Sequence, residues 1–373
     1  MRNEVISQQL LKWYDQMKRQ LPWRENKEPY RIWLSEIMLQ QTQVVTVIDY
    51  FNRFISVFPD VYTLADADEE QVFKCWEGLG YYSRARNLHL CAKKVVEEYG
   101  GVFPSCYEAL LKLPGIGPYT AGAIASIAFD EKVPAVDGNV LRVISRLFCI
   151  DAAINQPKNH GLFVEQTTAL LPDRVGDFNQ ALMELGATVC TPKRWKCEVC
   201  PIGQACCANQ SQRVDDFPVK LKKTPQRVQK VAICIVRSKL NPSKLLVIKH
   251  DSSGLLGNLW GFPRYEMPFE SEILEAEALY NWFENLFGVR PKLLEREKGM
   301  PHVFTHIKWQ TELLYLELED EIQIDYPKME WVNMTELNAL ALPKAYIKQL
   351  EFIKKTMTKK EEENAHTRTH QGP

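Results

Sequence analysis

Four cysteines close together in the sequence constrain the fold of this chain more than any other feature. They are spaced C-x6-C-x2-C-x5-C, at Cys190, Cys197, Cys200 and Cys206, and Cys207 follows outside this spacing. Four thiolates so placed can surround one compact object, and both tetrahedral zinc and a [4Fe–4S] cluster use four cysteines. The run holds one C-x2-C pair where zinc ribbons use two, so the spacing favours an iron–sulfur cluster over zinc. In a reducing compartment, such clustering indicates a metal site rather than disulfides.

Changes in composition along the chain predict two folded parts. Residues 1–206 show apolar positions at helical spacing, interrupted by short Gly and Pro turns. Residues 207–229 are polar and basic with two prolines, which is typical of a linker. Residues 230–356 mix short apolar runs, bounded by turn signals, with helical patterns, and predict an α+β domain. Residues 357–373 are charged and poor in apolar residues, so we expect a disordered tail.

The overall composition is that of a globular protein and gives no support for a nucleic-acid function. Apolar residues make up 45% and charged residues 25% of the chain, and the formal net charge is −1. Nucleic-acid-binding proteins usually carry an excess of basic residues, so any such function must rest on motifs. No apolar run approaches the ~18 residues of a transmembrane helix, and the N-terminus lacks the pattern of a signal peptide. We therefore expect a cytoplasmic protein without a membrane segment.

A glycine-containing string, L-P-G-I-G-P-Y-T-A-G, begins at Leu113 and joins two helical stretches within residues 108–129. Gly115 and Gly117 permit a tight turn with positive φ, and Pro118 suits the first turn of the next helix, where no N–H is needed. The backbone N–H groups at such a helix start can bind one phosphate without reading a base. The string resembles the helix-hairpin-helix motif of DNA-binding proteins.

Two carboxylates are candidates for acid–base chemistry, although each also has a purely structural interpretation. Glu36 lies in an apolar and amide-rich helical segment, where burial would raise its pKa and suit a general acid. Otherwise it is one surface glutamate on an amphipathic helix. Asp137 follows an apolar extended run and precedes a helix, where a carboxylate commonly caps the helix N-terminus. Taken singly, the structural interpretation is the commoner one for each residue.

Taken together, the motifs resemble those of a known family. The hairpin, the string V-D-G-N at 136–139 and the cysteine run resemble the endonuclease III superfamily of DNA glycosylases. The strings S-E-I-M-L-Q-Q-T-Q-V from Ser35, P-W-R from Pro22 and L-G-Y-Y-S-R-A-R from Leu79 are similar to those of the adenine DNA glycosylases within it. That family also carries a C-terminal Nudix-like domain. The implied fold is multidomain: an all-α helix-hairpin-helix glycosylase domain with an iron–sulfur loop, followed by an α+β Nudix-like domain.

The resemblance implies an activity and a set of catalytic residues. The family removes adenine paired with 8-oxoguanine or guanine from double-stranded DNA in base excision repair, by hydrolysing the N-glycosidic bond after base flipping. Glu36 matches the general acid that protonates adenine N7, and Asp137 matches the carboxylate that stabilises the positively charged sugar. Tyr119 and Asn139 match supporting pocket residues, and the four cysteines match the [4Fe–4S] ligands. We expect a monomer at the nucleoid of a prokaryote, and no motif identifies a protein partner.

The resemblance also implies contacts with DNA. Gln41 and Tyr81 match residues that enter the duplex near the lesion and fill the space left by the flipped base. The other positions expected at the DNA are Arg24, Thr42, Arg84, Gly115 and Gly117.

The residue after the hairpin predicts how the glycosidic bond is cleaved. The bifunctional endonuclease III type has a lysine there, whose amine attacks the sugar and permits strand cleavage through a Schiff base. This chain has Tyr119 in that place, and a phenol cannot form an imine. We therefore expect base removal by water without significant lyase activity. Two alternatives are a pyrimidine glycosylase/lyase and a non-catalytic DNA-binding or redox-sensing iron–sulfur protein.

The second domain is expected to recognise a lesion rather than to hydrolyse a nucleotide. Active Nudix hydrolases need a helix bearing R-E-x-x-E-E, and the segment Glu272–Gly288 has neither an Arg-Glu nor a Glu-Glu pair. In the family this domain senses 8-oxoguanine through a loop, and Phe304, Thr305 and His306 occupy that place. Thr305 departs from the related Phe-Ser-His pattern but keeps a hydroxyl. Without the resemblance, a buried β-hairpin would be the simpler interpretation.

Overall fold

The structure is a computed structural model that describes residues 2–222, 225–251, 254–268, 276–319, 321 and 329–351. The expected tail, 357–373, and the start of the segment inspected for a Nudix signature lie outside the described residues. The chain divides into two compact units. The first comprises Met1–Cys75 and Ser83–Lys223, and the second comprises Trp76–Tyr82 and Thr224–Pro373. No helix among the described residues is both long enough and apolar enough to cross a membrane.

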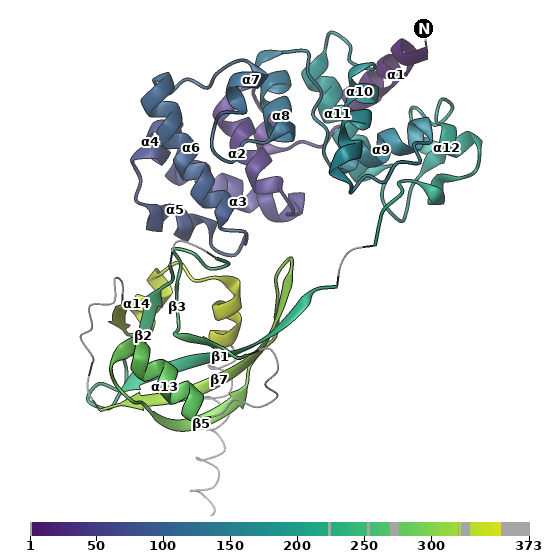
Figure 1. The fold of residues 1–373 in the computed structure, drawn as a ribbon. Helices are drawn as coiled ribbons and strands as arrows, with labels where there is room; N and C mark the ends of the chain where they lie inside the picture. The colour runs from purple at the N-terminus through teal and green to yellow at the C-terminus, as the bar shows by residue number, and fades with distance from the viewer. Residues whose placement is uncertain are drawn as a thin grey trace, which may run out of the picture. The chain divides into compact units, whose positions relative to one another are not determined.

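The first unit is helical, and runs from purple to teal in Figure 1. Its helices are α1 Arg2–Met17, α2 Pro29–Leu39, α3 Val44–Val57, α4 Val61–Asp66, α5 Glu69–Trp76, α6 Ser83–Tyr99, α7 Tyr107–Leu110, α8 Pro118–Phe129, α9 Gly138–Phe148, α10 His160–Thr168, α11 Val175–Thr188 and α12 Cys207–Gln210, with short turns η1 Pro22–Arg24, η2 Pro157–Asn159, η3 Cys197–Val199 and η4 Val214–Asp216. Pro29 and Pro118 occupy the first turns of α2 and α8, where a missing N–H has no cost. Asp60 and Asp137 cap α4 and α9 by accepting hydrogen bonds from backbone N–H groups.

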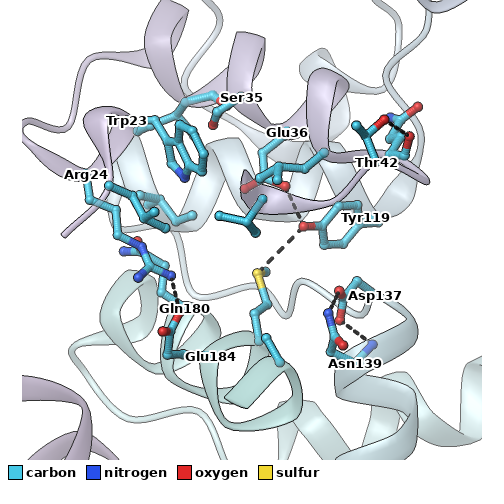
Figure 2. A pocket seen from close by; sticks show the side chains of 18 of the residues that line it. Trp23, Arg24, Ser35, Glu36, Thr42, Tyr119, Asp137, Asn139, Gln180 and Glu184 are labelled. Atoms are coloured by element: carbon cyan, nitrogen blue, oxygen red, sulfur yellow. Dashed lines mark hydrogen bonds and ion pairs between the residues drawn. The ribbon is translucent and has the colours of Figure 1, made fainter. Parts of the chain in front are cut away.

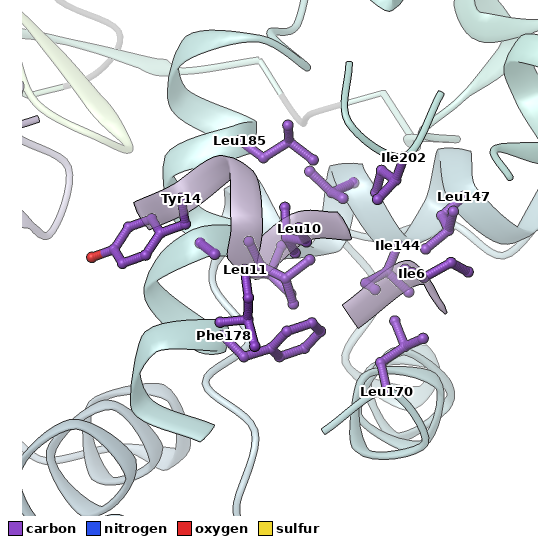
Figure 3. Close-up of a cluster of buried hydrophobic side chains, with 14 of the residues drawn as sticks. Ile6, Leu10, Leu11, Tyr14, Ile144, Leu147, Leu170, Phe178, Leu185 and Ile202 are labelled. Carbon is purple, nitrogen blue, oxygen red and sulfur yellow. The ribbon is translucent and has the colours of Figure 1, made fainter. Parts of the chain in front are cut away.

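A hydrophobic core joins the N-terminal helix to helices from the middle of the chain (Figure 3). Leu10 and Tyr14 of α1 meet Ile144 of α9 and Phe178 and Leu185 of α11. The two α1 residues are four positions apart, so they lie on one face of the helix. A second group of helices packs around α2, which contacts α3, α6 and α8. The elements that carry the candidate site, α2, α8, α9 and α11, are therefore each anchored by packing.

The second unit contains a mixed sheet with strand order β3-β2-β1-β7-β5. Strands β1 and β7 are parallel, and the pairs β1–β2, β2–β3 and β5–β7 are antiparallel. The elements are β1 Arg227–Ser238, β2 Leu245–Lys249, β3 Trp260–Gly261, β4 Arg264–Glu266, α13 Ala276–Phe287, β5 Lys292–Lys298, β6 His302–Val303, β7 Ile307–Leu318, β8 Met329–Val332 and α14 Met334–Ala339.

Strand β1 is buried on both faces of the sheet. Val231 and Ile233 belong to one hydrophobic cluster, which includes Trp309. Ala232 belongs to another, which includes Phe283 of α13. Successive side chains of a strand point to opposite faces, so the continuous apolar run that predicted this strand fills two cores.

The segment expected as a linker, 207–229, is folded in its first half. It forms α12 and η4, and its Ala208, Val214 and Phe217 make a small apolar cluster. Arg146 of α9 donates a hydrogen bond from Nε to the Phe217 carbonyl at 3.0 Å. Three buried apolar side chains thus hold a segment whose composition is otherwise polar.

Glycines permit close approaches beside the segment that precedes Asp137. A Cβ added at Gly122 of α8 would lie 2.4 Å from the Pro134 carbonyl oxygen. A Cβ at Gly176 of α11 would lie 2.5 Å from the Ser126 carbonyl oxygen on α8. Backbone therefore packs directly on backbone where α8 meets the extended segment and α11.

Replacing Gly122 by alanine should lower the free energy of unfolding by about 1–3 kcal/mol, because the added methyl group meets backbone that cannot rotate away. Gly161→Ala in α10 is the matched control, since a Cβ there has no neighbour within 4 Å and alanine favours a helix. Urea unfolding measures both. Equal stability of the Gly122 variant and the natural protein would show that the close approach is not needed.

Candidate active site

Seven residues singled out in the sequence line one cavity of the first unit (Figure 2). The cavity has a volume of about 530 Å³, and its walls come from η1, α2, α8, α9, α11 and the turn after α2. The seven residues are Arg24, Glu36, Gln41, Thr42, Tyr119, Asp137 and Asn139. Folding thus collects all four expected catalytic residues and three of the expected DNA contacts at one place.

Glu36 is the buried acid of this cavity. It is 6% exposed, and the Tyr119 hydroxyl donates a hydrogen bond to its Oε2. Burial raises the pKa of Glu36 to about 7, while the hydrogen bond from Tyr119 opposes the rise and the charge of Asp137 adds to it. Near neutral pH both the protonated and the ionised form of Glu36 are therefore populated, as a general acid requires. The interpretation of Glu36 as a surface residue is wrong.

Asp137 caps α9 and also faces the cavity. Its Oδ1 accepts hydrogen bonds from Asn139 N at 2.9 Å and Val140 N at 2.7 Å, and its Oδ2 accepts one from Asn139 Nδ2 at 2.7 Å. Burial raises the pKa of Asp137, and these three bonds, which favour the carboxylate, oppose the rise. The structural and chemical interpretations of Asp137 are compatible, because the cap fixes the carboxylate that lines the cavity.

Arg142, which is not among the residues expected from the sequence, connects the cavity to the cysteine run. It is 7% exposed. Its Nη2 donates to Asn139 Oδ1 at 2.9 Å and to the Gly186 carbonyl at 2.7 Å, and its Nε donates to the Cys190 carbonyl at 2.7 Å. The amide that supports Asp137 is therefore itself held by a buried guanidinium.

The wall formed by α11 was also missed. The Glu184 side chain is 1% exposed, and its Oε2 accepts hydrogen bonds at 2.9 Å from Arg19 Nη2 and from Arg24 Nη2. Burial alone would raise the pKa of Glu184, but the hydrogen bonds and charges of the two arginines bring it below its usual range. Arg24, expected at the DNA, thus forms an ion pair at the cavity. The sequence contains a pattern that could have indicated this wall, because Gln180 and Glu184 are polar residues four positions apart on a largely apolar helix.

Arg84 lies elsewhere than expected. It is buried, and its Nη1 donates to the carbonyl oxygens of Ile37 and Met38 at 2.9 Å and of Gln40 at 2.6 Å. The guanidinium therefore satisfies carbonyl groups at the C-terminal end of α2, which lack helical partners. Arg84 is therefore not an exposed DNA contact, and it stabilises the turn that carries Gln41.

Gln41 and Tyr81 share an uncommon backbone conformation. Gln41 has φ 58° and Tyr81 has φ 50°, and both side chains are exposed. The left-handed region costs about 1–3 kcal/mol for residues other than glycine and is common at functional sites. Within the second unit, Thr305 Oγ1 donates a hydrogen bond to the Tyr81 hydroxyl at 3.2 Å.

The glycine hairpin needs positive φ at one glycine. Gly115 has φ 73°, and a Cβ there would lie 2.7 Å from Asn87 Cβ. Gly117, at the N-cap of α8, has φ −94° and therefore does not need the left-handed region. A Cβ at Gly117 would meet nothing within 4 Å, so the start of α8 has open space beside it.

The cysteine loop, residues 190–206, places all four expected ligands around one small cavity. Arg146 lies at the same cavity and donates from Nη1 to Cys190 Sγ at 3.3 Å and to the Thr191 carbonyl at 2.9 Å. No three His, Cys, Asp or Glu side chains among the described residues are arranged to hold a single metal ion. Four thiols and a guanidinium around one space fit a negatively charged group that takes a cysteine at each of four corners, as a [4Fe–4S] cluster does.

The expectation of a metal site rather than disulfides is wrong for Cys207, the fifth cysteine of the segment, which was left outside the ligand set. Cys207 is bonded to Cys149, 58 positions earlier in the sequence at the end of α9. Cys190, Cys197, Cys200 and Cys206 remain free thiols.

The three residues expected to sense a lesion lie at the turn between β6 and β7. The Phe304 N–H donates to the Ile307 carbonyl at 2.8 Å, and the Phe304 ring packs edge-on against Trp309 with centroids 4.7 Å apart. Thr305 and His306 are exposed. The turn is therefore anchored by one aromatic side chain and presents two polar side chains to solvent, rather than being buried.

Comparison with known proteins agrees with this architecture. Residues 34–161 match the HhH-GPD superfamily of base excision DNA repair proteins, and residues 232–352 match the NUDIX domain. The chain is 40% identical to the adenine DNA glycosylase of Mus musculus, over 83% of this chain and 70% of that protein. It is 33% identical to the adenine DNA glycosylase of Buchnera aphidicola subsp. Schizaphis graminum, over 94% of this chain and 99% of that protein. A solved thermostable thymine-DNA glycosylase is 31% identical, covers 56% of this chain and 97% of its own, and has a TM-score of 0.52.

The fold and the cavity define a helix-hairpin-helix base excision DNA repair glycosylase that carries a Nudix-like domain, which confirms the expected fold class. The chain belongs to the adenine DNA glycosylase family. It is a DNA N-glycosylase, a hydrolase that acts on N-glycosyl bonds in DNA. The alternative of a non-catalytic iron–sulfur protein is wrong.

Replacing Glu36 by glutamine should stabilise the protein at alkaline pH. The folded-state pKa of about 7 lies above the ordinary value of 4.5, so the natural protein loses stability as the pH rises between these values. An amide avoids this loss, and we expect a gain of about 3 kcal/mol near pH 8 that falls below about 1 kcal/mol near pH 5.

Urea unfolding of Glu36→Gln at the two pH values measures this gain. Glu97→Gln, which changes an exposed glutamate of α6, is the control and should show no such difference. A gain for Glu36→Gln that is the same at both pH values would contradict the buried acid.

Proposed function

We propose that this enzyme excises adenine paired with 8-oxoguanine or guanine from double-stranded DNA, by hydrolysing the N-glycosidic bond after the base has flipped out. The observation that carries the proposal is the presence of Glu36 and Asp137 in one cavity, in different environments. Two carboxyl groups in different environments can have different pKa values, so that one serves as the acid and the other stays ionised. A base stacked inside a duplex cannot enter such a cavity, so the reaction requires flipping.

Glu36 acts as the general acid. In its protonated form it donates a proton to adenine N7, which makes the base a neutral leaving group. The Tyr119 hydroxyl donates to Oε2 and thereby leaves Oε1 to carry the proton. Burial raises the pKa of the Tyr119 phenol, so it remains a donor throughout the reaction.

Asp137 stabilises the sugar as the base departs. Positive charge develops on the sugar ring, and a fixed carboxylate lowers the energy of that state. Asn139 and the two backbone N–H groups hold the carboxylate in place, and Arg142 holds Asn139. Water completes the hydrolysis and leaves an abasic site.

The enzyme has no significant lyase activity in this proposal. Strand cleavage through a Schiff base needs an amine at the sugar, and Tyr119 supplies a phenol. No lysine among the described residues lines the cavity. Alkali is then required to break the strand at the abasic site.

The cysteine loop holds a [4Fe–4S] cluster through Cys190, Cys197, Cys200 and Cys206. The support is the common cavity of the four thiols and the guanidinium of Arg146 beside it. When bound, the cluster cross-links four points of the loop and supplies negative charge opposite the arginine.

The DNA contacts follow from exposure and backbone geometry. Gln41 and Tyr81 are exposed and have left-handed backbone conformations, and they enter the duplex near the lesion. Thr42 and the hairpin glycines Gly115 and Gly117 lie at the phosphate backbone, since N–H groups at a helix start suit a phosphate. The exposed turn of Phe304, Thr305 and His306 recognises 8-oxoguanine.

Single-turnover cleavage of three duplexes tests the reaction: adenine opposite 8-oxoguanine, adenine opposite guanine, and cytosine opposite 8-oxoguanine. We expect strand breaks in the first two only after alkali, and none in the third. Glu36→Gln and Asp137→Asn should each slow base removal by about 100- to 10,000-fold, and Glu97→Gln should not. Breaks without alkali, or activity on damaged pyrimidines, would point to the lyase type instead.

Replacing Thr305 by valine tests lesion recognition, because valine keeps the shape of threonine and removes its hydroxyl. Loss of one hydrogen bond should reduce the preference for 8-oxoguanine over guanine by about 5- to 10-fold. The measurement is the ratio of dissociation constants for two duplexes that carry an uncleavable adenosine analogue opposite each base. Thr168→Val, an exposed position of α10, is the control, and an unchanged ratio for Thr305→Val would exclude the hydroxyl from recognition.

A further inference from the structure

Cys149 and Cys207 form a site that neither the glycosylase chemistry nor the four-thiol set uses. Their sulfur atoms are bonded, and their Cα atoms are 5.6 Å apart. Cys149 is the left-handed residue that ends α9, and Cys207 is the first residue of α12, directly after the cysteine loop. We propose that this pair is a reversible dithiol–disulfide site, which in its oxidised state fastens the end of the cysteine loop to α9.

The cysteine loop has little regular structure of its own. Between Cys190 and Cys206, all of which the structure describes, the short turn η3 is its one helical element. A segment of this kind keeps its fold through attachments to its surroundings.

Both ends of the loop are attached to the C-terminal end of α9. Arg146 there donates to Cys190 Sγ at 3.3 Å and to the Thr191 carbonyl at 2.9 Å, which holds the start of the loop. At the other end, Cys206 Sγ lies 3.3 Å from the Arg146 carbonyl, and the adjacent Cys207 is bonded to Cys149. The disulfide therefore adds a covalent attachment at the end of the loop, where Arg2 Nη2 also donates a hydrogen bond to the Ala205 carbonyl at 3.0 Å.

The position of the disulfide permits exchange with a reductant. Both cysteines are half-buried, and Cys149 packs against the small apolar cluster of Ala208, Val214 and Phe217. A dithiol reductant, small or protein-borne, supplies two electrons and two protons, breaks the Sγ–Sγ bond, leaves two thiols and becomes a disulfide itself. A two-electron thiol oxidant of the diamide class reverses the step and is itself reduced.

The bond stabilises the folded loop because it lowers the conformational entropy of the unfolded chain. It joins residues that are 58 positions apart, and closing a segment of that length removes much of the conformational freedom of the unfolded state. Reduction restores this freedom. Oxidation and reduction of this pair therefore change the stability of the loop without changing any of the four thiols that line its cavity.

Thiol mapping of the full-length protein tests whether the bond forms and reverses. Protein treated with diamide or with dithiothreitol is denatured, alkylated and digested, and the masses of its peptides are measured by mass spectrometry. We expect a cross-linked pair of peptides containing Cys149 and Cys207 after diamide, and two separately alkylated peptides after dithiothreitol. Absence of that pair after diamide, or a pair that joins Cys207 to a cysteine of the loop, would overturn the proposal.

Thermal unfolding, followed by the circular dichroism of the helices, tests whether the bond fastens the loop. The midpoint of the diamide-treated protein should exceed that of the dithiothreitol-treated protein by about 5–10 °C. Cys149→Ser and Cys207→Ser should each abolish this difference, whereas Cys106→Ser, which changes an exposed free cysteine, should keep it. Equal midpoints for the two forms of the natural protein would contradict the proposal. The readout does not involve base excision, so it is independent of the proposed function.

Discussion

The placement of two carboxyl groups in one cavity, Glu36 buried and Asp137 half-buried, is the constraint on which the rest of the helical unit depends. An ionised Glu36 among apolar side chains is costly, and its raised pKa expresses that cost. Asp137 avoids part of the cost, because its own helix supplies the N–H groups that it needs. Arg84 closes the helix that carries the first carboxyl, and Arg142 holds the amide beside the second. At Glu36, the burial that raises the pKa therefore also makes the ionised form costly to the fold. At Asp137, the hydrogen bonds that orient the carboxylate also stabilise the fold.

One helix joins this cavity to the cysteine loop. Helix α9 is capped by Asp137, carries Arg146 in its last turn and ends at Cys149. Its 11 residues span about 16 Å at the usual rise of an α-helix. Anything that holds the loop in place thus also holds the far end of the helix that orients the Asp137 carboxylate. The buried Arg142 adds a second connection midway, because it contacts both Asn139 and the Cys190 carbonyl.

The sequence predicted features that are encoded locally, and missed those made by folding. The capping position of Asp137, the turn at Gly115 and the two fold classes could be predicted from neighbouring residues and periodicity. Glu36 remained ambiguous, because its burial depends on helices that are distant in the sequence. Glu184 was missed, since its arginine partners lie 160 or more positions away. The partner of Cys207 lies 58 positions away, and spacing along one loop carries no information about such a pair.

The parallel pairing of β1 with β7 sets an order on how the chain acquires structure during synthesis. Each residue of β1 pairs with a residue of β7 about 80 positions later, because parallel strands need a long crossover. All of the helical unit has been synthesised once Lys223 is added, so it can fold first. Strand β1 meanwhile emerges as an apolar segment with an unpaired edge, which invites pairing with other chains. Until Leu318 has been translated, β1 therefore lacks its full parallel partner, and pairing with other chains can compete with folding.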